Sequence, residues 1–262
     1  MDVDALDSAH DLIDQATAIC VLSGAGLSTD SGIPDFRGPN GLWTSDPGAE
    51  MLSSYDAYVT SEEVRKAAWQ HRLHSPLWSA QPNRGHHAIV DRERQGRLLG
   101  IVTQNIDGLH QRAGSEPTLV IEVHGSAHRS TCLTCGEELP IEQVLERVAA
   151  GEVDPRCSHR NGSQRCDGIL KSSTISFGQA LRPESMEHAL TLATTCDVLL
   201  AVGTTLAVYP VASIVPKAQE SGARVVIINR GPTALDALAD VLVDGALSDV
   251  LPHVLARKAS TS

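Results

Sequence analysis

Aromatic side chains make up only 3% of the 262 residues. A hydrophobic core drawn from the 42% of hydrophobic residues must therefore be mostly aliphatic, as in the covered sheets of α/β proteins. Positive charge is also in short supply, since 21 Lys and Arg residues stand against 32 Asp and Glu residues. The formal net charge of -11 argues against direct binding to nucleic acid or to an anionic membrane.

Long hydrophobic runs are missing as well. None reaches the length that spans a bilayer, and the acidic, polar start MDVDALDSAHDL is unlike a signal peptide. We therefore expect a cytoplasmic protein with no membrane partner, and its oligomeric state is left open. Six cysteines are too few for a disulfide scaffold in a chain of this length, and four of them cluster between positions 132 and 166.

Short apolar runs alternate with helical patterns along most of the chain. This alternation predicts an α/β fold with a doubly wound, parallel, Rossmann-like sheet. Two stretches, 44–82 and 128–170, interrupt it and predict a smaller lobe with a helical module and a zinc module. The Rossmann-like domain then comprises 1–43, 83–127 and 171–258. The predicted strands are 18–22, 98–103, 119–123, 198–202, 224–228 and 241–243, and the main helices are 3–17, 83–95, 184–195, 210–221 and 247–257.

The first predicted strand runs into a glycine loop that begins Gly24-Ala25-Gly26. Glycines in this position let a backbone approach the phosphates of a dinucleotide. The spacing departs from G-x-G-x-x-G, because Thr29 stands where the third glycine belongs. The loop alone therefore favours nucleotide binding only weakly, and a tight turn is the alternative.

The cysteine cluster is a stronger signal. Cys132 and Cys135 form a C-x-x-C knuckle, and Cys157 and Cys166 form a second, looser pair in a polar segment. Four thiolates around one ion make a closed structural zinc site, which has no open position for catalysis. His159 lies close enough in the sequence to replace one cysteine, and this alternative stays open.

Polar residues follow several other predicted strands. Since the carboxyl ends of parallel strands meet at one sheet edge, they should share a ligand cleft. His124 is the candidate general base there, because histidine titrates near neutrality. The remaining candidates are Thr103, Gln104, Asn105, Asp107, Gly203, Thr204, Thr205 and Asn229.

Together these segments resemble the sirtuin family of NAD-dependent protein-lysine deacylases. The resemblance rests on GAGLSTDSGIPDFRG, TQNIDGLH, EVHGS, the cysteine quartet, FGQAL, GTTLAVYP and IINR, which cover about 230 residues in the family's order. It implies that NAD and zinc are bound and that the partners are acyl-lysine proteins. The expected products are free lysine, nicotinamide and an O-acyl-ADP-ribose.

The resemblance also implies residue roles. His124 would act as the base on the ribose, assisted by Asn105 and Asp107, with Gln104 nearby. Gly24, Ala25 and Gly26 would line the phosphates, and Gly203, Thr204 and Asn229 would contact the adenosine half. The loop Asp35-Phe36-Arg37 would cover the nicotinamide end. Cys132, Cys135, Cys157 and Cys166 would hold zinc, and Phe177, Gly178 and Val208 would flank an acyl-lysine peptide bound as an added strand.

The acyl group is the open point of this interpretation. Family members that prefer succinyl or malonyl groups carry Tyr-x-x-Arg where this chain has Trp69 and Arg72. Deacetylation is the default expectation, and a preference for acidic acyl groups is the alternative. Two further alternatives are a mono-ADP-ribosyltransferase and a non-catalytic zinc-ribbon interaction protein.

Overall fold

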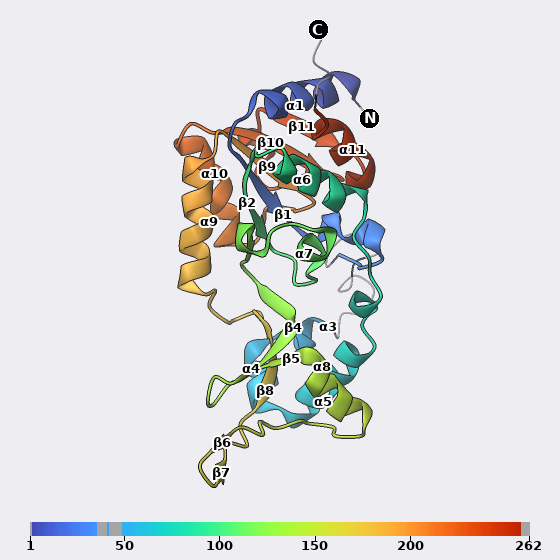
Figure 1. The fold of residues 1–262 in the computed structure, drawn as a ribbon, viewed down its shortest axis with the longest axis vertical. Helices are drawn as coiled ribbons and strands as arrows, with labels where there is room; N and C mark the ends of the chain where they lie inside the picture. The colour runs from blue at the N-terminus through green and yellow to red at the C-terminus, as the bar shows by residue number, and fades with distance from the viewer. Residues whose placement is uncertain (1, 36–40, 42–48, 258–262) are drawn as a thin grey trace.

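A six-stranded parallel sheet forms the centre of the larger domain (Figure 1). The structure, a computed structural model, describes residues 2–35, 41 and 49–257, so Phe36 and Arg37 of the predicted nicotinamide loop lie outside the described residues. The strand order β11-β10-β9-β1-β2-β3 confirms the doubly wound fold class. The strands are β1 (Ile19–Ser23), β2 (Leu98–Thr103), β3 (Val120–Glu122), β9 (Val198–Val202), β10 (Arg224–Asn229) and β11 (Val241–Asp244).

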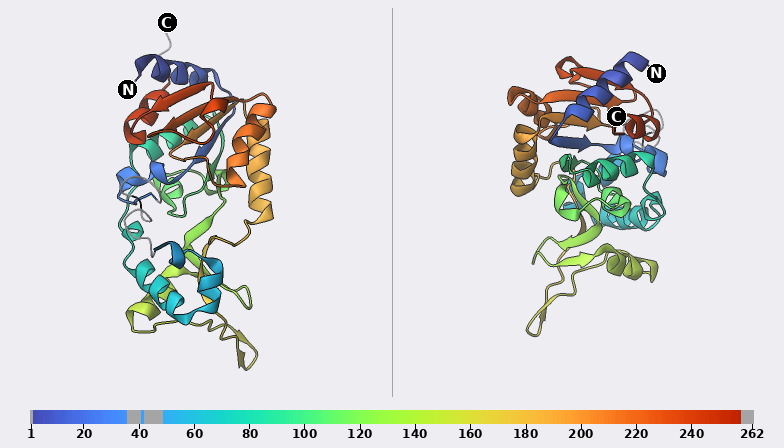
Figure 2. Two further views of the ribbon diagram at one scale, coloured as in Figure 1. Left: turned by 180° about the vertical axis from the view of Figure 1, so that it is seen from behind. Right: turned by 45° about the horizontal axis from the view of Figure 1, so that its top comes forward.

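Helices cover both faces of this sheet, as Figure 2 shows from two further sides. Successive side chains of a strand point to opposite faces. Accordingly, Ile19 and Val21 of β1 belong to one apolar cluster, whereas Cys20 and Leu22 belong to the other. The first cluster lies under α1 (Val3–Gln15), α6 (Arg84–Arg94) and α11 (Leu247–Val254). The second lies under α9 (Pro183–Thr195) and α10 (Ile214–Glu220).

The smaller lobe lies beyond the carboxyl ends of β1 and β2, at the lower end of Figure 1. It holds an antiparallel sheet of β5 (Glu138–Pro140), β4 (Gly125–Cys132) and β8 (Leu170–Thr174). Because β4 starts at Gly125 and β8 ends at Thr174, this sheet extends a few residues past the limits expected for the lobe. The other elements of the lobe are α3 (Ala49–Leu52), α4 (Tyr55–Thr60), α5 (Glu62–Leu73), α8 (Ile141–Ala149) and the hairpin β6 (Arg160–Asn161)–β7 (Gln164–Arg165).

A buried ion pair joins the two parts of the smaller lobe. The Arg65 guanidinium on α5 lies 3.0 Å from the Asp154 carboxylate, and both side chains are almost fully buried. Arg65 also donates to the carbonyls of Tyr58 and Val59, so its charge is well solvated by protein. Breaking one partner of such a pair would leave an uncompensated buried charge. The pair therefore fixes the helical module against the zinc module.

Short elements complete the chain. They are α7 (Leu109–Ala113) and the 3-10 turns Ala25–Leu27, Thr29–Ser31, Pro76–Trp78, Pro117–Leu119, Val211–Ser213 and Asp236–Leu238. Among the described helices, none has both the length and the apolar character that crossing a bilayer would require.

Candidate active site

The carboxyl ends of the central strands bring the predicted site residues to one edge of the sheet. Ser23 at the end of β1 pairs with Thr103 of β2 on one side and with Val202 of β9 on the other. Three segments follow these strands. They are the glycine loop that begins at Gly24, the TQNID segment (103–107) and the GTT segment (203–205). They therefore meet at the edge that faces the smaller lobe (Figure 1).

The glycines of two of these loops allow the loops to pack directly on each other. A Cβ on Gly24 would lie 2.7 Å from the Gly203 carbonyl oxygen, and one on Gly26 would lie 2.8 Å from the Gly203 Cα. Gly203 itself has a φ of 62°, which disfavours any other residue. The amide of Gly26 donates to the Gly203 carbonyl at 2.9 Å. The glycines thus serve this contact between loops in addition to any approach by phosphate.

Asn105 and Asp107 lie in a buried polar network with a residue that the sequence patterns do not single out. The Ser28 hydroxyl donates to Asp107 Oδ2 at 2.7 Å and accepts from Asn105 Nδ2 at 3.2 Å. Asn105 Nδ2 also donates to the Gly24 carbonyl at 3.0 Å. Ser28 is 1% exposed, so it joins the glycine loop to the TQNID segment. Its place within the glycine loop is its one signal in the sequence.

His124 is held in a defined orientation by the same segment. Its Nδ1 lies 3.1 Å from the Gln104 carbonyl oxygen, which can only accept, so Nδ1 carries the proton. Burial lowers the pKa of His124, although the hydrogen bond to Gln104 opposes this shift. The neutral ring then keeps a lone pair on Nε2. The Gln104 side chain reaches across the edge and donates to Thr204 Oγ1 at 3.0 Å.

A cavity of about 220 Å³ opens at the ends of β10 and β11. Asn229, which the sequence predicts to contact the adenosine half, is part of its wall. Two carboxylates, Asp236 and Asp244, also line it, and Asp236 accepts from both the amide and the hydroxyl of Thr233. The remaining lining residues are Ile227, Gly231, Pro232, Thr233, Leu242 and Val243.

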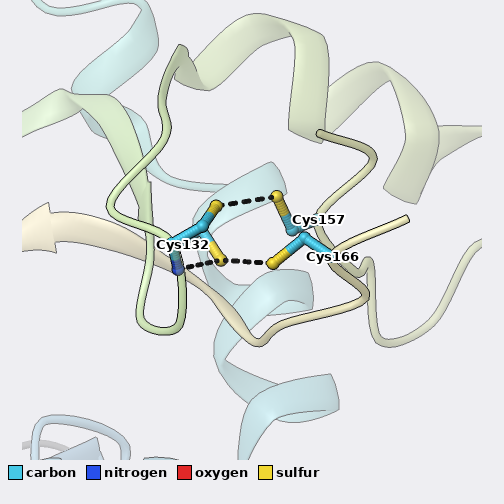
Figure 3. A group of neighbouring side chains, drawn as sticks. Cys132, Cys157 and Cys166 are labelled. Atoms are coloured by element: carbon cyan, nitrogen blue, oxygen red, sulfur yellow. Dashed lines mark hydrogen bonds between the residues drawn. The ribbon is translucent and has the colours of Figure 1, made fainter. Parts of the chain in front are cut away.

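The four predicted cysteine ligands come together in the smaller lobe. Figure 3 shows Cys132, Cys157 and Cys166 pointing toward a common centre. The four sulfur atoms, Cys135 included, lie within 4.8 Å of one another. Two of the sulfur pairs, Cys132–Cys166 and Cys135–Cys157, are 3.7 Å apart. Zinc–sulfur bonds of about 2.3 Å in a tetrahedron give a sulfur–sulfur spacing of about 3.8 Å. The cluster therefore has the dimensions of a zinc site.

His159, the alternative ligand, lies outside this cluster. Its Nδ1 is 3.2 Å from a carboxylate oxygen of Glu137. The hairpin of β6 and β7 accounts for the long spacing between Cys157 and Cys166, because the hairpin projects away from the lobe between these two ligands (Figure 1).

The two residues considered for acyl recognition occupy different surroundings. Trp69 is fully buried in the apolar cluster of the zinc module, and its Nε1 has no hydrogen-bond partner among the described residues. The Arg72 guanidinium lies 5.5 Å from the Trp69 ring and 5.8 Å from the Tyr58 ring, within the range of cation–π contacts. The Tyr58 hydroxyl donates to the Leu170 carbonyl, so its one proton is already used.

The predicted peptide-contacting residues lie on segments that leave the two sheets. Phe177, 47% exposed, exchanges backbone hydrogen bonds with Ser53 and Tyr55 of the smaller lobe. Gly178 follows it with a φ of 83°, and Val208 lies half-buried in the loop after β9. Asp35 is half-buried at the end of the first described segment.

Comparison with known proteins supports a common origin for the whole arrangement. The model of the Sir2 family matches residues 24–210. A Streptomyces coelicolor protein named NAD-dependent protein deacetylase 2 is 44% identical over 90% of this chain and 96% of its own. A Pyrobaculum aerophilum protein named NAD-dependent protein deacylase 2 is 40% identical over 94% of this chain and 92% of its own.

Solved structures agree with the sequence matches. A structure described as "Structural Basis for the Mechanism and Regulation of Sir2 Enzymes" superposes with a TM-score of 0.86 at 34% identity and covers 97% of both chains. A Sir2 complex with a p53 peptide and NAD+ has a TM-score of 0.83 at 28% identity, with 95% of this chain and 97% of that chain covered.

Proposed function

This chain belongs to the Sir2 family, and we propose that it removes acyl groups from protein lysines in an NAD-dependent reaction. One solved relative holds an acetylated peptide and another a propionylated peptide. Short neutral acyl groups, acetyl first, are therefore the proposed substrates. The cytoplasmic location expected from the composition belongs to the same proposal.

The observation that carries the proposal is the orientation of His124. The Gln104 carbonyl holds the proton on Nδ1, and the lowered pKa keeps the ring neutral at physiological pH. Nε2 is then ready to accept a proton, as a general base must be. When bound, NAD would supply a ribose carbon that accepts the acyl oxygen as nicotinamide leaves. His124 would take the proton of a hydroxyl on that ribose.

Asn105 and Asp107 would hold the ribose and bound water at a fixed position. Each is tied by a hydrogen bond to Ser28, and Asn105 is also tied to the backbone of the glycine loop. Such a buried, mutually bonded set loses little freedom when ligand binds, which favours a well-ordered reacting geometry. Gly203, Thr204 and Asn229 would contact the adenosine half, and the cavity beside Asn229 has room for part of it.

Zinc would be held by Cys132, Cys135, Cys157 and Cys166. All four positions around the ion would be filled by sulfur, so no water could be activated there. Cys132 and Cys157 also belong to the apolar cluster of the zinc module, together with Trp69. Zinc would therefore stabilise the lobe and take no part in the reaction.

The proposal is tested by incubating the protein with NAD and an acetyl-lysine peptide. Nicotinamide release and loss of the acetyl group should proceed at equal rates. His124→Ala should lower kcat at least about 100-fold, the usual loss on removing a general base. His87→Gln, a change at an exposed histidine of α6, should leave the rate unchanged. Deacetylation that continues without NAD would overturn the proposal.

Acidic acyl groups are a second candidate because two basic side chains, Arg72 and Lys171, lie in the smaller lobe. Lys171 is 1% exposed and donates to the carbonyls of Ser172 and Thr174. Burial, with the nearby Arg72 charge, lowers the pKa of Lys171 to about 7. Neither basic side chain forms an ion pair with a carboxylate of the described residues. The distal carboxylate of a succinyl or malonyl group would supply the missing ion-pair partner.

The acyl preference is decided by comparing acetyl-lysine and succinyl-lysine versions of one peptide. If Arg72 binds the distal carboxylate, Arg72→Ala should raise KM for the succinyl peptide while leaving KM for the acetyl peptide unchanged. Equal changes for both peptides would mean that Arg72 only supports the lobe. In that case the acetyl group remains the proposed substrate.

A further inference from the structure

A second cavity lies at the amino-terminal ends of the central strands, on the side of the large sheet opposite to the candidate active site. Its volume is about 120 Å³, and its lining residues are Asp14, Arg92, Gln95, Arg97 and Arg257. Asp14 lies in the last turn of α1, Arg92 in the last turn of α6 with Gln95 directly after it, and Arg97 immediately precedes β2. The Arg97 carbonyl accepts from the amide of Ile19, the first residue of β1. The cavity is therefore at the amino ends of β1 and β2.

Three guanidinium groups meet one carboxylate around this cavity. The local balance is positive, whereas the chain as a whole has a formal net charge of -11. Burial is the main cause that lowers the pKa of Arg92, and the nearby charges of Arg97 and Arg257 lower it further. Asp14 opposes them, but its Oδ1 is 3.9 Å from the nearest Arg92 nitrogen, which is a long ion pair. The cavity thus keeps an excess of positive charge.

Arg92 is buried and is held in place by hydrogen bonds, unlike an arginine on the surface. Its side chain is 2% exposed, and it donates to the Ile13 carbonyl and to Gln95 Oε1. Arg92 Nε is buried and has no hydrogen-bond partner among the described residues. Arg97 donates to the Ala16 carbonyl at 2.7 Å. Two guanidinium groups are therefore held in place by backbone carbonyls at the end of α1.

Arg257 completes the set from the C-terminal side of α11. Its side chain is exposed and forms no hydrogen bond or ion pair with the described part of the chain. It can therefore move toward a ligand at little cost to the fold. Guanidinium groups are well suited to oxyanions, because their N–H groups match the oxygen spacing of phosphate.

We propose that this cavity binds a small dianionic oxyanion, namely inorganic phosphate or the phosphoryl group of a small phosphate monoester. The ligand balances the excess charge of the three arginines over Asp14. A volume of about 120 Å³ has room for several waters, since one water needs only about 10–15 Å³, so it also has room for a phosphate group. The ligand ties together α1, α6 and the chain after α11. This site is independent of the proposed function.

The test is a calorimetric titration with inorganic phosphate at constant ionic strength, with chloride as the reference anion. ADP-ribose is present at saturation to fill the candidate active site. We expect saturable binding of one phosphate per chain. Arg257→Gln should weaken it by about 2–5-fold, as for an exposed charge, and Arg97→Gln by about tenfold or more.

Asp14→Asn is the decisive variant, because it should act in the opposite direction. Removing the one carboxylate should tighten phosphate binding several-fold, whereas simple damage to the cavity would weaken it. A parallel titration with glycerol 3-phosphate distinguishes the two ligand sources. Binding of the ester at similar affinity identifies a phosphoryl-group site, and binding of phosphate alone identifies an inorganic phosphate site.

Three results would overturn the proposal. The first is the absence of saturable phosphate binding in the wild-type protein. The second is binding that ADP-ribose abolishes, which would locate the phosphate in the candidate active site. The third is an unchanged affinity in folded Arg257→Gln, Arg97→Gln and Asp14→Asn proteins, with folding checked by circular dichroism.

Discussion

Two buried histidines beneath the candidate active site should make the protein sensitive to mild acid. His86 on α6 is fully buried, and His110 on α7 is 2% exposed. Their ring centroids are 5.3 Å apart. His110 Nε2 lies 2.9 Å from the Ser23 hydroxyl, which itself donates to Thr103, so Nε2 must be the donor. His110 Nδ1 and His86 Nε2 have no partners among the described residues.

Protonation of either ring would place a charge where little is available to solvate it. Burial lowers the pKa of His86 to about 3, with His110 as a second cause, and burial lowers the pKa of His110 to about 4. An unfolded histidine has a pKa of about 6.5, so the unfolded chain binds more protons at mild acid pH. The stabilising effect of these two neutral rings is therefore complete above about pH 6.5 and is lost as the pH falls toward 4.

The size of the stability loss follows from these pKa values. Between pH 7 and pH 5, protonation of each histidine stabilises the unfolded chain by about 2 kcal/mol, whereas it stabilises the folded chain by almost nothing. The two residues together should lower the free energy of unfolding by about 4 kcal/mol. This is a large fraction of the roughly 5–15 kcal/mol that holds a typical domain folded.

Urea unfolding at pH 7 and pH 5, followed by circular dichroism, measures this loss. His86→Asn keeps an acceptor near the Asn83 amide, and His110→Gln keeps a donor near Ser23. The double variant should lose about 4 kcal/mol less than the wild type between the two pH values. The comparison cancels other titrating groups, including the cysteine cluster. His87→Gln is the matched control on α6, because that ring is exposed. Equal losses in the wild type and the double variant would show that these two histidines do not cause the loss of stability in acid.

Three further perturbations test other parts of the site. Ser28→Ala should lower kcat/KM by about 10–100-fold, because leaving its buried polar partners unsatisfied costs about 1–3 kcal/mol, and an unchanged kcat/KM would contradict this role. Gly26→Ala should weaken NAD binding and lower the free energy of unfolding by about 1–3 kcal/mol, because the added Cβ would meet Gly203. Calorimetry measures the NAD affinity and urea unfolding measures the stability, and wild-type values in both would count against the contact between the loops. Metal analysis should find one zinc per chain, and removal of that zinc by a chelator should shift the fluorescence of the buried Trp69. A protein that stays folded and active without metal would exclude a structural role for zinc.

The architecture was predictable because its signals are local. Each central strand is a short apolar run such as Val198–Val202, and buried parallel strands need little else to be recognised. Polar residues directly after such strands, including Asn105 and His124, then had to share one edge. The four-cysteine cluster also followed from spacing, with His159 excluded only once the structure placed it beside Glu137.

The rest depends on contacts between distant segments, which residue spacing does not encode. β4 and β8 are polar strands of the smaller lobe, and their pairing brings together segments about 40 residues apart. Ser28 acquires its position only when the glycine loop packs against the TQNID segment. Trp69 could be aligned with an acyl-recognition position, but its orientation toward the apolar core depends on packing by α8 and the cysteine loops.

In the proposed reaction, the acyl group leaves lysine for a ribose derived from NAD. This transfer is measured by mass spectrometry of the products formed from an acetyl-lysine peptide and NAD. We predict equal amounts of deacetylated peptide, nicotinamide and O-acetyl-ADP-ribose, and no O-acetyl-ADP-ribose with His124→Ala. Free acetate formed without NAD, or ADP-ribosylated protein beside an intact acetyl peptide, would contradict the claim.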